Sequence, residues 1–240
     1  MPTPAQLIGH RGAARLAPEN TLPGIELAAR LGLPWIEIDA QLTRDGVLVL
    51  MHDHELERTT DLTGTVREHD WATLAQADAG AWFGPEYAGV RIPRLDATIE
   101  LCRSLGIGMH IEIKPLDTHE TDTAEAVADL LRTVALPESL IISSFSGNTV
   151  ATMHRLLPDH PRAQGAEHFP EDWREISRSL ELDAWHVDAN IVTPELAPML
   201  REAGLAVRAW TVNDRDRARQ LIDWGVESVF TDDPPTLLGR

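Results

Sequence analysis

The 240-residue chain contains one cysteine and no long apolar run. Because Cys102 has no second thiol to pair with, an internal disulfide is excluded and a reducing compartment is expected. No stretch approaches the roughly 18 consecutive apolar residues that indicate a membrane-spanning helix. The opening residues, MPTPAQLIGHRG, have neither a basic start nor an apolar segment. We therefore expect no signal peptide, no membrane span and a cytoplasmic protein.

Basic residues are also scarce: 21 Lys and Arg stand against 38 Asp and Glu, for a net charge of −17. This charge argues against nucleic acid as a partner and against docking on an anionic membrane. It leaves room for a small anionic substrate, because a metal ion and a few local cations can reverse the field inside a pocket. With 43% hydrophobic residues, the chain can form one large domain over residues 1–240.

The stretch from Trp35 to Asp53 carries the first sign of a site. Over residues 35–42 polar and apolar side chains alternate, which is typical of a strand with one apolar face. Glu37 and Asp39 then share the other face, about 7 Å apart along the strand. Two acids at this spacing are close enough to share one cation, although a pair of surface or salt-bridged acids would give the same pattern.

Two further strands extend this pattern. Residues 43–46 indicate a tight turn with an Asp-Gly signal, and the apolar run 47–51 predicts a buried strand that ends at His52. In residues 109–115 the alternation returns, with His110, Glu112 and Lys114 on one face. Two strands with carboxylates on matched faces indicate a polar interior at one end of a barrel.

Strands and helices alternate along the whole chain. Strands are expected at 6–9, 35–42, 109–115, 140–143, 162–164, 184–187, 205–212 and 227–231. Helices are expected at 20–31, 96–105, 119–135, 147–157, 171–181, 193–204 and 214–224. Eight such units predict an α/β fold, the (β/α)8 TIM barrel, with a doubly wound open sheet as the alternative. Residues 54–92 are too long for an ordinary loop and predict a small insertion after the second strand, with its own aromatic cluster, leaning over the site.

Short motifs follow one another over residues 8–235. They are Gly9-His10-Arg11-Gly12, Pro18-Glu19-Asn20-Thr21, Ile36-Glu37-Ile38-Asp39, His52-Asp53 with Arg58-Thr59-Thr60, Asp78-Ala79-Gly80 with Trp82-Phe83, Ile92-Pro93-Arg94-Leu95, Glu112-Ile113-Lys114, Ser143-Ser144-Phe145, Trp210-Thr211-Val212-Asn213 and Thr231-Asp232-Asp233-Pro234. In this order the set resembles the glycerophosphodiester phosphodiesterase family, of the cytosolic bacterial type. The resemblance implies a TIM barrel whose characteristic insertion is residues 54–92. Residues 160–190 match this family poorly.

The resemblance implies that Glu37, Asp39 and Glu112 bind one divalent cation, Mg²⁺ or Ca²⁺. The chemistry of the residues agrees with this, because three converging carboxylates repel one another unless a cation lies between them. Ligands that are all oxygen favour Mg²⁺ or Ca²⁺ over zinc.

The resemblance also implies that His10 and His52 are the catalytic acid–base pair and that Arg11 and Lys114 bind the phosphate. Histidine suits proton transfer near neutral pH, and arginine suits paired hydrogen bonds to phosphate. Lys114 can also neutralise its neighbour Glu112.

Three further residues have two interpretations each. Glu19 and Asn20 either cap the first helix or help to hold the site. Trp210 is either an apolar wall for glycerol or part of the packed core.

The function implied is metal-dependent hydrolysis of a small-molecule glycerophosphodiester to sn-glycerol 3-phosphate and an alcohol. Attack by the glycerol 2-hydroxyl through a cyclic phosphate and direct attack by water give the same products. The alternatives are a lysophospholipase D-like activity on longer lipids and a non-catalytic phosphodiester-binding protein. A binding protein would be expected to have lost one of the histidines or acids, and all are present. Monomer and homo-oligomer both remain open.

Overall fold

The computed structural model describes residues 2–115 and 121–239 of the chain. Its strands are β1 (Leu7–Gly9), β2 (Trp35–Leu42), β3 (Leu48–Leu50), β4 (Gly108–Ile113), β5 (Leu140–Ser144), β6 (Arg162–Ala166), β7 (Ala184–Asp188), β8 (Ala206–Trp210) and β9 (Ser228–Thr231). Its α-helices are α1 (Leu22–Arg30), α2 (Trp71–Leu74), α3 (Leu95–Leu105), α4 (Asp122–Leu131), α5 (Gly147–Leu156), α6 (Trp173–Ser179), α7 (Leu196–Glu202), α8 (Arg215–Asp223) and α9 (Pro234–Leu238). Short 3₁₀ turns lie at Pro4–Gln6, Val66–Glu68 and Pro85–Tyr87.

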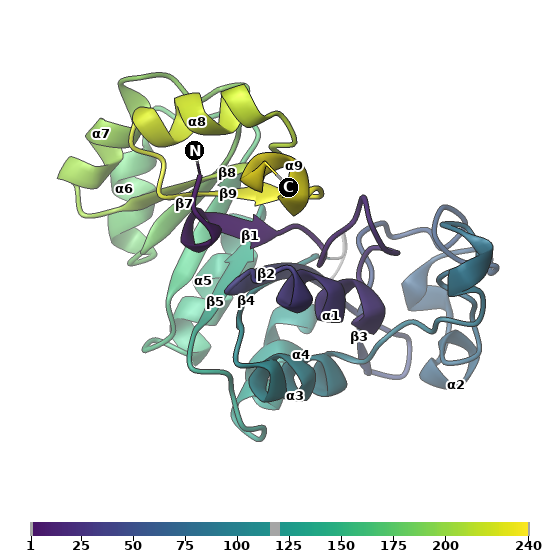
Figure 1. Cartoon of the computed structure of the whole chain (residues 1–240). Coiled ribbons are helices and arrows are strands. Elements are labelled where there is room, and N and C mark those ends of the chain that lie inside the picture. Colours follow the sequence, from purple (N-terminus) through teal and green to yellow (C-terminus); the bar gives the residue numbers. More distant parts are fainter. Residues whose placement is uncertain (1, 116–120, 240) are drawn as a thin grey trace.

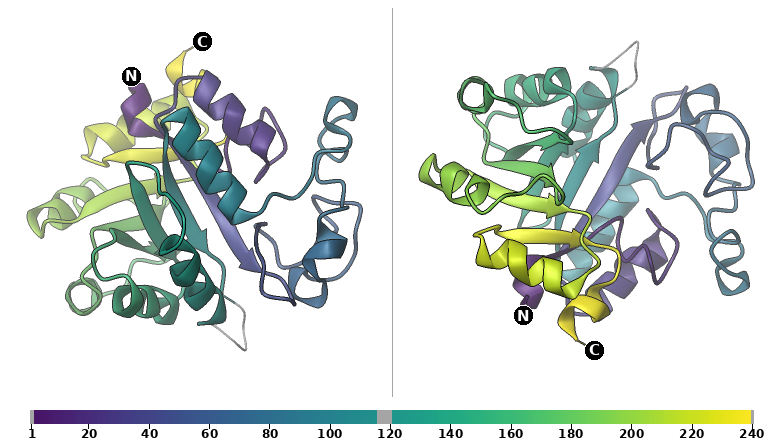
Figure 2. Two further views of the ribbon diagram at one scale, coloured as in Figure 1. Left: turned by 90° about the horizontal axis from the view of Figure 1, so that it is seen from below. Right: turned by 90° about the horizontal axis from the view of Figure 1, so that it is seen from above.

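Every strand except β3 belongs to one parallel sheet that closes on itself. The strands follow the order β1-β9-β8-β7-β6-β5-β4-β2, and β1 pairs with β2 as well as with β9. The helices cover the outside of this ring (Figures 1 and 2). This confirms the predicted (β/α)8 barrel and excludes the open sheet, because an open sheet would leave β1 paired on one side.

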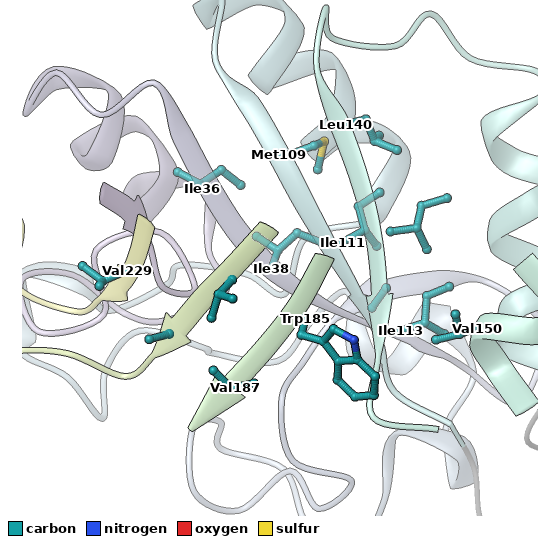
Figure 3. Packing of buried hydrophobic residues seen from close by; sticks show 14 of the residues in the cluster. Ile36, Ile38, Met109, Ile111, Ile113, Leu140, Val150, Trp185, Val187 and Val229 are labelled. Atoms are coloured by element: carbon teal, nitrogen blue, oxygen red, sulfur yellow. The ribbon is translucent and has the colours of Figure 1, made fainter. Parts of the chain in front are cut away.

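The main hydrophobic core lies between the barrel wall and its helices. Ile36 and Ile38 of β2 point outward into this layer with Ile111 of β4, and all three are buried (Figure 3). Because side chains alternate along a strand, Glu37 and Asp39 must then point into the barrel. The register places Asp39 directly beside Glu112, so the apolar outer faces align the acids on the inner ones.

Aromatic rings fill the barrel below the acids. Trp35 packs edge-on against His110 at 5.0 Å between ring centroids, and His110 lies 5.2 Å from His186. Phe230 of β9 contacts both histidines. Burial holds the pKa of both His110 and His186 well below its usual range, with the Arg208 charge acting in the same direction. These two imidazoles are therefore neutral packing groups that close the floor of the barrel.

The insertion after β2 has a different core from the one expected. β3 runs antiparallel to β2, with Leu48 opposite Leu42 across the predicted turn. Residues 54–92 then stand to one side of the barrel, beyond the end of β2 (Figure 1). Their core is aliphatic, built around Leu56, Val66 and Leu74. An aromatic cluster is present as well, but it consists of the edge-to-face rings of Trp82, Phe83 and Tyr87 beside this core.

Several predicted boundaries shift. Thr193 was expected to begin a helix, but α7 begins at Leu196 and follows Glu195. The helix predicted from residue 119 begins outside the described residues, and α4 is described from Asp122. The sequence did not predict α9. No α-helix in the described ranges combines the length and the apolar character needed to cross a membrane.

Truncating a side chain of the outer core should destabilise the barrel strongly. Ile38 is fully buried, so Ile38→Ala is expected to lower the free energy of unfolding by about 2–5 kcal/mol and Ile38→Val by about 0.5–1.5 kcal/mol. Urea unfolding followed by tryptophan fluorescence measures both. Leu105→Ala, at a residue on α3 that is 39% exposed, is the control with little expected loss. Equal losses at Ile38 and Leu105 would contradict this description of the core.

Candidate active site

The carboxyl ends of the barrel strands surround a cavity of about 360 Å³. Its lining residues are His10, Arg11, Glu37, Asp39, His52, Glu112, Lys114, Pro115, Ser143, Ser144, Phe145, Gly165, Glu167, His186, Trp210, Thr211 and Phe230. The charged and acid–base groups come mainly from β1, β2, the end of β3 and β4. The wall from β5 to β9 is mostly small or aromatic.

Three carboxylates converge on one side of this cavity. One oxygen atom from each of Glu37, Asp39 and Glu112 lies within 4.8 Å of the other two. Glu37 is 3% exposed and Asp39 is 1% exposed, so water screens their repulsion poorly. An arrangement of this kind needs positive charge to be stable.

Lys114 and Arg11 supply part of that charge. Lys114 Nζ lies 3.1 Å from Asp39 Oδ1 and also forms an ion pair with Glu112. Arg11 Nε lies 3.4 Å from Asp39 Oδ2. Burial raises the pKa of the Asp39 carboxyl, but the charges of Lys114 and Arg11 outweigh this and hold it well below its usual range. Asp39 is therefore an anion in the folded protein.

The carboxylate of Glu37 has less positive charge around it than that of Asp39. Burial and the neighbouring charges of Asp39 and Glu112 raise its pKa well above the usual range. One oxygen, Oε2, accepts a hydrogen bond from the backbone N–H of Arg11 at 3.0 Å, while Oε1 is buried with no partner among the described residues. An orphaned carboxylate oxygen beside two other carboxylates fits a cation ligand of the oxygen-binding class, Mg²⁺ or Ca²⁺.

The loop after β1 is shaped by two glycines. A Cβ atom on Gly9 would lie 2.1 Å from the carbonyl oxygen of Gly12. Gly12 itself has φ +92°, and a Cβ there would lie 2.8 Å from the backbone of Gly24. The chain can therefore fold tightly against α1, which turns Arg11 toward the acids.

Glu19 and Asn20 hold Arg11 and Asp39 in place through hydrogen bonds. Arg11 Nη1 donates to Glu19 Oε1 at 2.8 Å. Asn20 donates from Nδ2 to Asp39 Oδ2 at 2.8 Å and accepts from the backbone N–H of Asp39 at 3.1 Å. The cap of α1 is instead Thr21, whose hydroxyl accepts from Gly24. Neither Glu19 nor Asn20 caps the helix through its side chain.

His10 is oriented by a carboxylate from the other end of the chain. Its Nδ1 lies 2.6 Å from Asp232 Oδ1, and Asn213 donates to Asp232 Oδ2 at 2.7 Å. Burial raises the pKa of Asp232, but the hydrogen bonds and charge around it leave a net lowering, so it stays an anion. An anionic partner at Nδ1 holds the proton there and leaves Nε2 for chemistry.

His52 has the same kind of support. Its Nδ1 lies 2.7 Å from Asp53 Oδ1, and Asp53 forms an ion pair with Arg58 that lowers its pKa to about 2. Arg58 also donates to both oxygens of Glu19, at 2.8 and 2.7 Å. Burial lowers the pKa of His52, which favours the neutral imidazole. Arg58 thus links the insertion to the site, although no residue of 54–92 lines the cavity.

The cavity wall formed by β5 and β6 has small side chains and so leaves room for a substrate. The inward positions of β5 and β6 carry the small residues Ser143 and Gly165. Phe145 and Trp210 meet above them edge to face, with ring centroids 5.3 Å apart. Trp210 is half-buried and lines the cavity rather than the outer core.

Residues 10–236 match the model of the glycerophosphoryl diester phosphodiesterase family. The chain belongs to this family. It is 32% identical to a glycerophosphodiester phosphodiesterase of Bacillus subtilis, over 95% of this chain and 83% of that protein. It is also 32% identical to a glycerophosphodiester phosphodiesterase of Caldanaerobacter subterraneus subsp. tengcongensis, over 97% and 96% of the two chains.

Solved structures agree with this membership. A phosphodiesterase from Oleispira antarctica, determined with the product sn-glycerol-3-phosphate, superimposes with a TM-score of 0.94. It is 34% identical to this chain, covering 98% of this chain and 95% of that one. A family member is an enzyme, a phosphodiesterase, and the barrel described above is the family's fold.

The cavity brings together eight of the ten side chains that the sequence singled out. They are His10, Arg11, Glu37, Asp39, His52, Glu112, Lys114 and Trp210. Glu19 and Asn20 do not line the cavity but bind Arg11 and Asp39 beneath it.

Sequence reasoning assigned no role to Asp53, Asp232, Arg58 or Gln41. Gln41 Nε2 donates to the carbonyl oxygens of residues 51–53 and so fixes the loop that carries His52. The sequence held a signal for each of the four. Asp53 and Asp232 follow strand ends, Gln41 shares the face of the acids, and Arg58 lies in one of the motifs of the family resemblance.

Removing the Glu37 charge should stabilise the protein in EDTA at high pH. The pKa of Glu37 is raised on folding from its ordinary value of 4.5, so the folded state holds this proton more tightly than the unfolded chain. Wild-type stability is therefore lost as pH rises through the folded pKa, and Glu37→Gln avoids that loss. We expect the melting temperature of the variant relative to wild type to increase by a few degrees between about pH 5 and about pH 8, since about 1 kcal/mol shifts it by roughly 2–4 °C.

Differential scanning calorimetry in EDTA checks this expectation. Glu202→Gln, at an exposed residue of α7, is the control and should show no such trend. A Glu37→Gln protein that melts below wild type near pH 8 would contradict the repulsion between the three acids.

Proposed function

We propose that this enzyme hydrolyses glycerophosphodiesters to sn-glycerol 3-phosphate and an alcohol, with a divalent cation and a pair of histidines. The observation that supports this most is the pairing of an acidic trio, two of its members buried, with two histidines, each bonded at Nδ1 to a carboxylate. Similarity to phosphodiesterases of this name, one of them determined with sn-glycerol-3-phosphate, supports the choice of substrate.

Arg11 and Lys114 would bind the phosphodiester anion. Both side chains line the cavity beside the acids, and each is largely buried. Their contacts with Asp39 hold them at the edge of the trio, so an incoming phosphate meets two fixed positive charges. Stabilisation of the charge that develops on the phosphoryl oxygens is worth most when the donors are positioned beforehand.

Glu37, Asp39 and Glu112 would hold the cation. Their oxygen ligands and the unpartnered Oε1 of Glu37 suit Mg²⁺ or Ca²⁺. When bound, such an ion neutralises charge on the phosphate and helps to orient the reacting groups. Asn20 keeps Asp39 in position through its two hydrogen bonds and so acts as a positioning residue.

His10 and His52 would transfer the protons. One imidazole takes the proton of the attacking hydroxyl, whether that belongs to the glycerol or to water, and the other gives a proton to the oxygen of the leaving alcohol. Asp232 and Asp53 fix the Nδ1 proton in each ring, so that Nε2 is the atom that exchanges protons. The lowered pKa of His52, caused first by burial, suits a group that is neutral before reaction.

Catalysis should depend on a divalent cation and on its support by Asn20. We expect release of glycerol 3-phosphate from glycerophosphocholine to stop in EDTA and to return with Mg²⁺ or Ca²⁺. Asn20→Ala should raise the cation concentration needed for half-maximal rate about 10- to 100-fold, because it frees Asp39 to move. A coupled glycerol 3-phosphate assay measures both effects.

Gln220→Ala, on the exposed face of α8, is the control for Asn20→Ala and should leave the cation requirement unchanged. Full activity after exhaustive chelation would show that catalysis needs no divalent cation. Absence of release with every metal, in a protein shown to be folded, would reject the proposed substrate.

Replacing either catalytic histidine should lower turnover. His10→Ala and His52→Ala are each expected to reduce kcat about 10²–10⁴-fold, the range for general acid–base groups. The acid can be told from the base with a 4-nitrophenyl diester, because its leaving group needs no proton. The variant that lacks the acid should recover most of its rate on that substrate, and the variant that lacks the base should not.

His160→Ala serves as the matched control, since His160 lies at the opposite end of the barrel beside Leu140 and Pro161. Near-normal turnover of either His10→Ala or His52→Ala with glycerophosphocholine would remove that residue from the mechanism.

A further inference from the structure

A second groove opens beside the active-site cavity, on the wall away from the acidic trio. It has a volume of about 610 Å³ and is lined by residues of β6, of the segment after it, and of α6. Phe145, Gly165 and Glu167 line both spaces, so the cavity and the groove meet at these residues. Among the described acids that line the cavity, Glu167 is thus the one that also lines the groove.

The groove itself has an acidic lining. The groove is lined by Phe145, Gly147, Gln164, Gly165, Ala166, Glu167, His168, Pro170, Ile176, Ser179, Leu180 and Trp185, with no lysine or arginine among these described residues. Glu167 carries the formal charge here. Its side chain is exposed, and within residues 2–115 and 121–239 no hydrogen bond or ion pair to its carboxylate is found.

Gln164 adds a second acceptor to the groove. Its Nε2 donates to the carbonyl oxygens of Phe145 and Gly165, both at 3.0 Å, which fixes the amide. The amide oxygen Oε1 is left buried without a partner among the described residues, in a side chain that is 7% exposed. Buried acceptors are normally satisfied, so an occupant that donates hydrogen bonds fits this groove better than one that only accepts them.

Phe145 forms the aromatic side of the junction. A Cβ atom on Gly165 would lie 2.8 Å from the Phe145 ring, so the ring packs directly on the glycine backbone. Lys114 Nζ already lies 5.9 Å from the centroid of the same ring. Phe145 is 37% exposed, so an ammonium group of either kind can reach the ring. A primary ammonium can in addition donate hydrogen bonds to the carboxylate of Glu167, which a quaternary ammonium cannot do.

We propose that Glu167, with the groove beside it, forms a subsite for the leaving alcohol and selects an alcohol that carries a primary ammonium group. The corresponding substrate class is that of glycerophosphoethanolamine. The inference rests on the proposed function, because it concerns the second alcohol of the same diester. Glu167 acts in specificity and takes no part in the proton transfers of His10 and His52.

The test compares kcat/KM for glycerophosphoethanolamine with kcat/KM for the neutral diester glycerophosphoglycerol. Glu167→Gln is expected to lower this ratio about 3- to 5-fold, the effect of one exposed charge pair, and Glu167→Lys to lower it further. The ratio in wild type should also shrink as salt is added, because a rim charge is screened. Glu175→Gln is the control and should keep the wild-type ratio, because Glu175 is also an exposed acid, lies on α6 and lines neither space.

Glycerophosphocholine separates the two kinds of cation. Its kcat/KM should fall less in Glu167→Gln than that of glycerophosphoethanolamine, because it has no N–H to donate. An equal or larger fall would overturn the primary ammonium assignment. A ratio unchanged by Glu167→Gln and Glu167→Lys in an active enzyme would overturn the subsite alone, whereas a wild-type protein inactive on all three diesters would overturn the proposed function itself.

Discussion

The site depends on the mutual repulsion of three converging carboxylates, two of them buried, and on the positive charges that offset it. Asp39 is surrounded by Lys114, Arg11 and the amide of Asn20, and it remains charged for that reason. Glu37 has a single backbone N–H and one unpartnered oxygen. This asymmetry leaves the trio short of positive charge on one side. The neighbouring loops surround the trio with polar groups, since the turn after β1 carries Arg11, the corner before α1 carries Asn20 and the loop after β3 carries His52.

The fold could be predicted from the sequence because two local patterns repeat along it. Ile36 and Ile38 alternate with Glu37 and Asp39, and the same alternation around Glu112 fixes which face of each strand is inside. The predicted start of α7 at Thr193 was wrong because it rested on one local signal and not on a repeated pattern. A capping residue followed by proline is a local preference, and in the folded chain the α-helix begins only after Glu195.

The candidate site was predictable where its groups lie on strand ends, and less so where it depends on contacts between distant segments. His10, Glu37 and Asp39 could be placed at one end of a barrel from spacing alone. Nothing in the spacing showed that Arg58 would reach Glu19, or that Gln41 would bind the carbonyls of residues 51–53. The groove beside Phe145 was hidden for a similar reason, because it depends on the absence of a side chain at Gly165 and on the place of the ring above it.

One contact ties the site to the closure of the barrel. His10 and Asp232 lie 222 positions apart, and the backbone N–H of His10 also bonds to the carbonyl of Thr231, so both depend on β1 and β9 lying side by side. During synthesis the imidazole emerges 222 residues before its carboxylate partner. A nascent or truncated chain that lacks the final strand has no oriented His10, whatever else has folded. Because of the order of translation, the His10–Asp232 pair is among the last parts of the site to form.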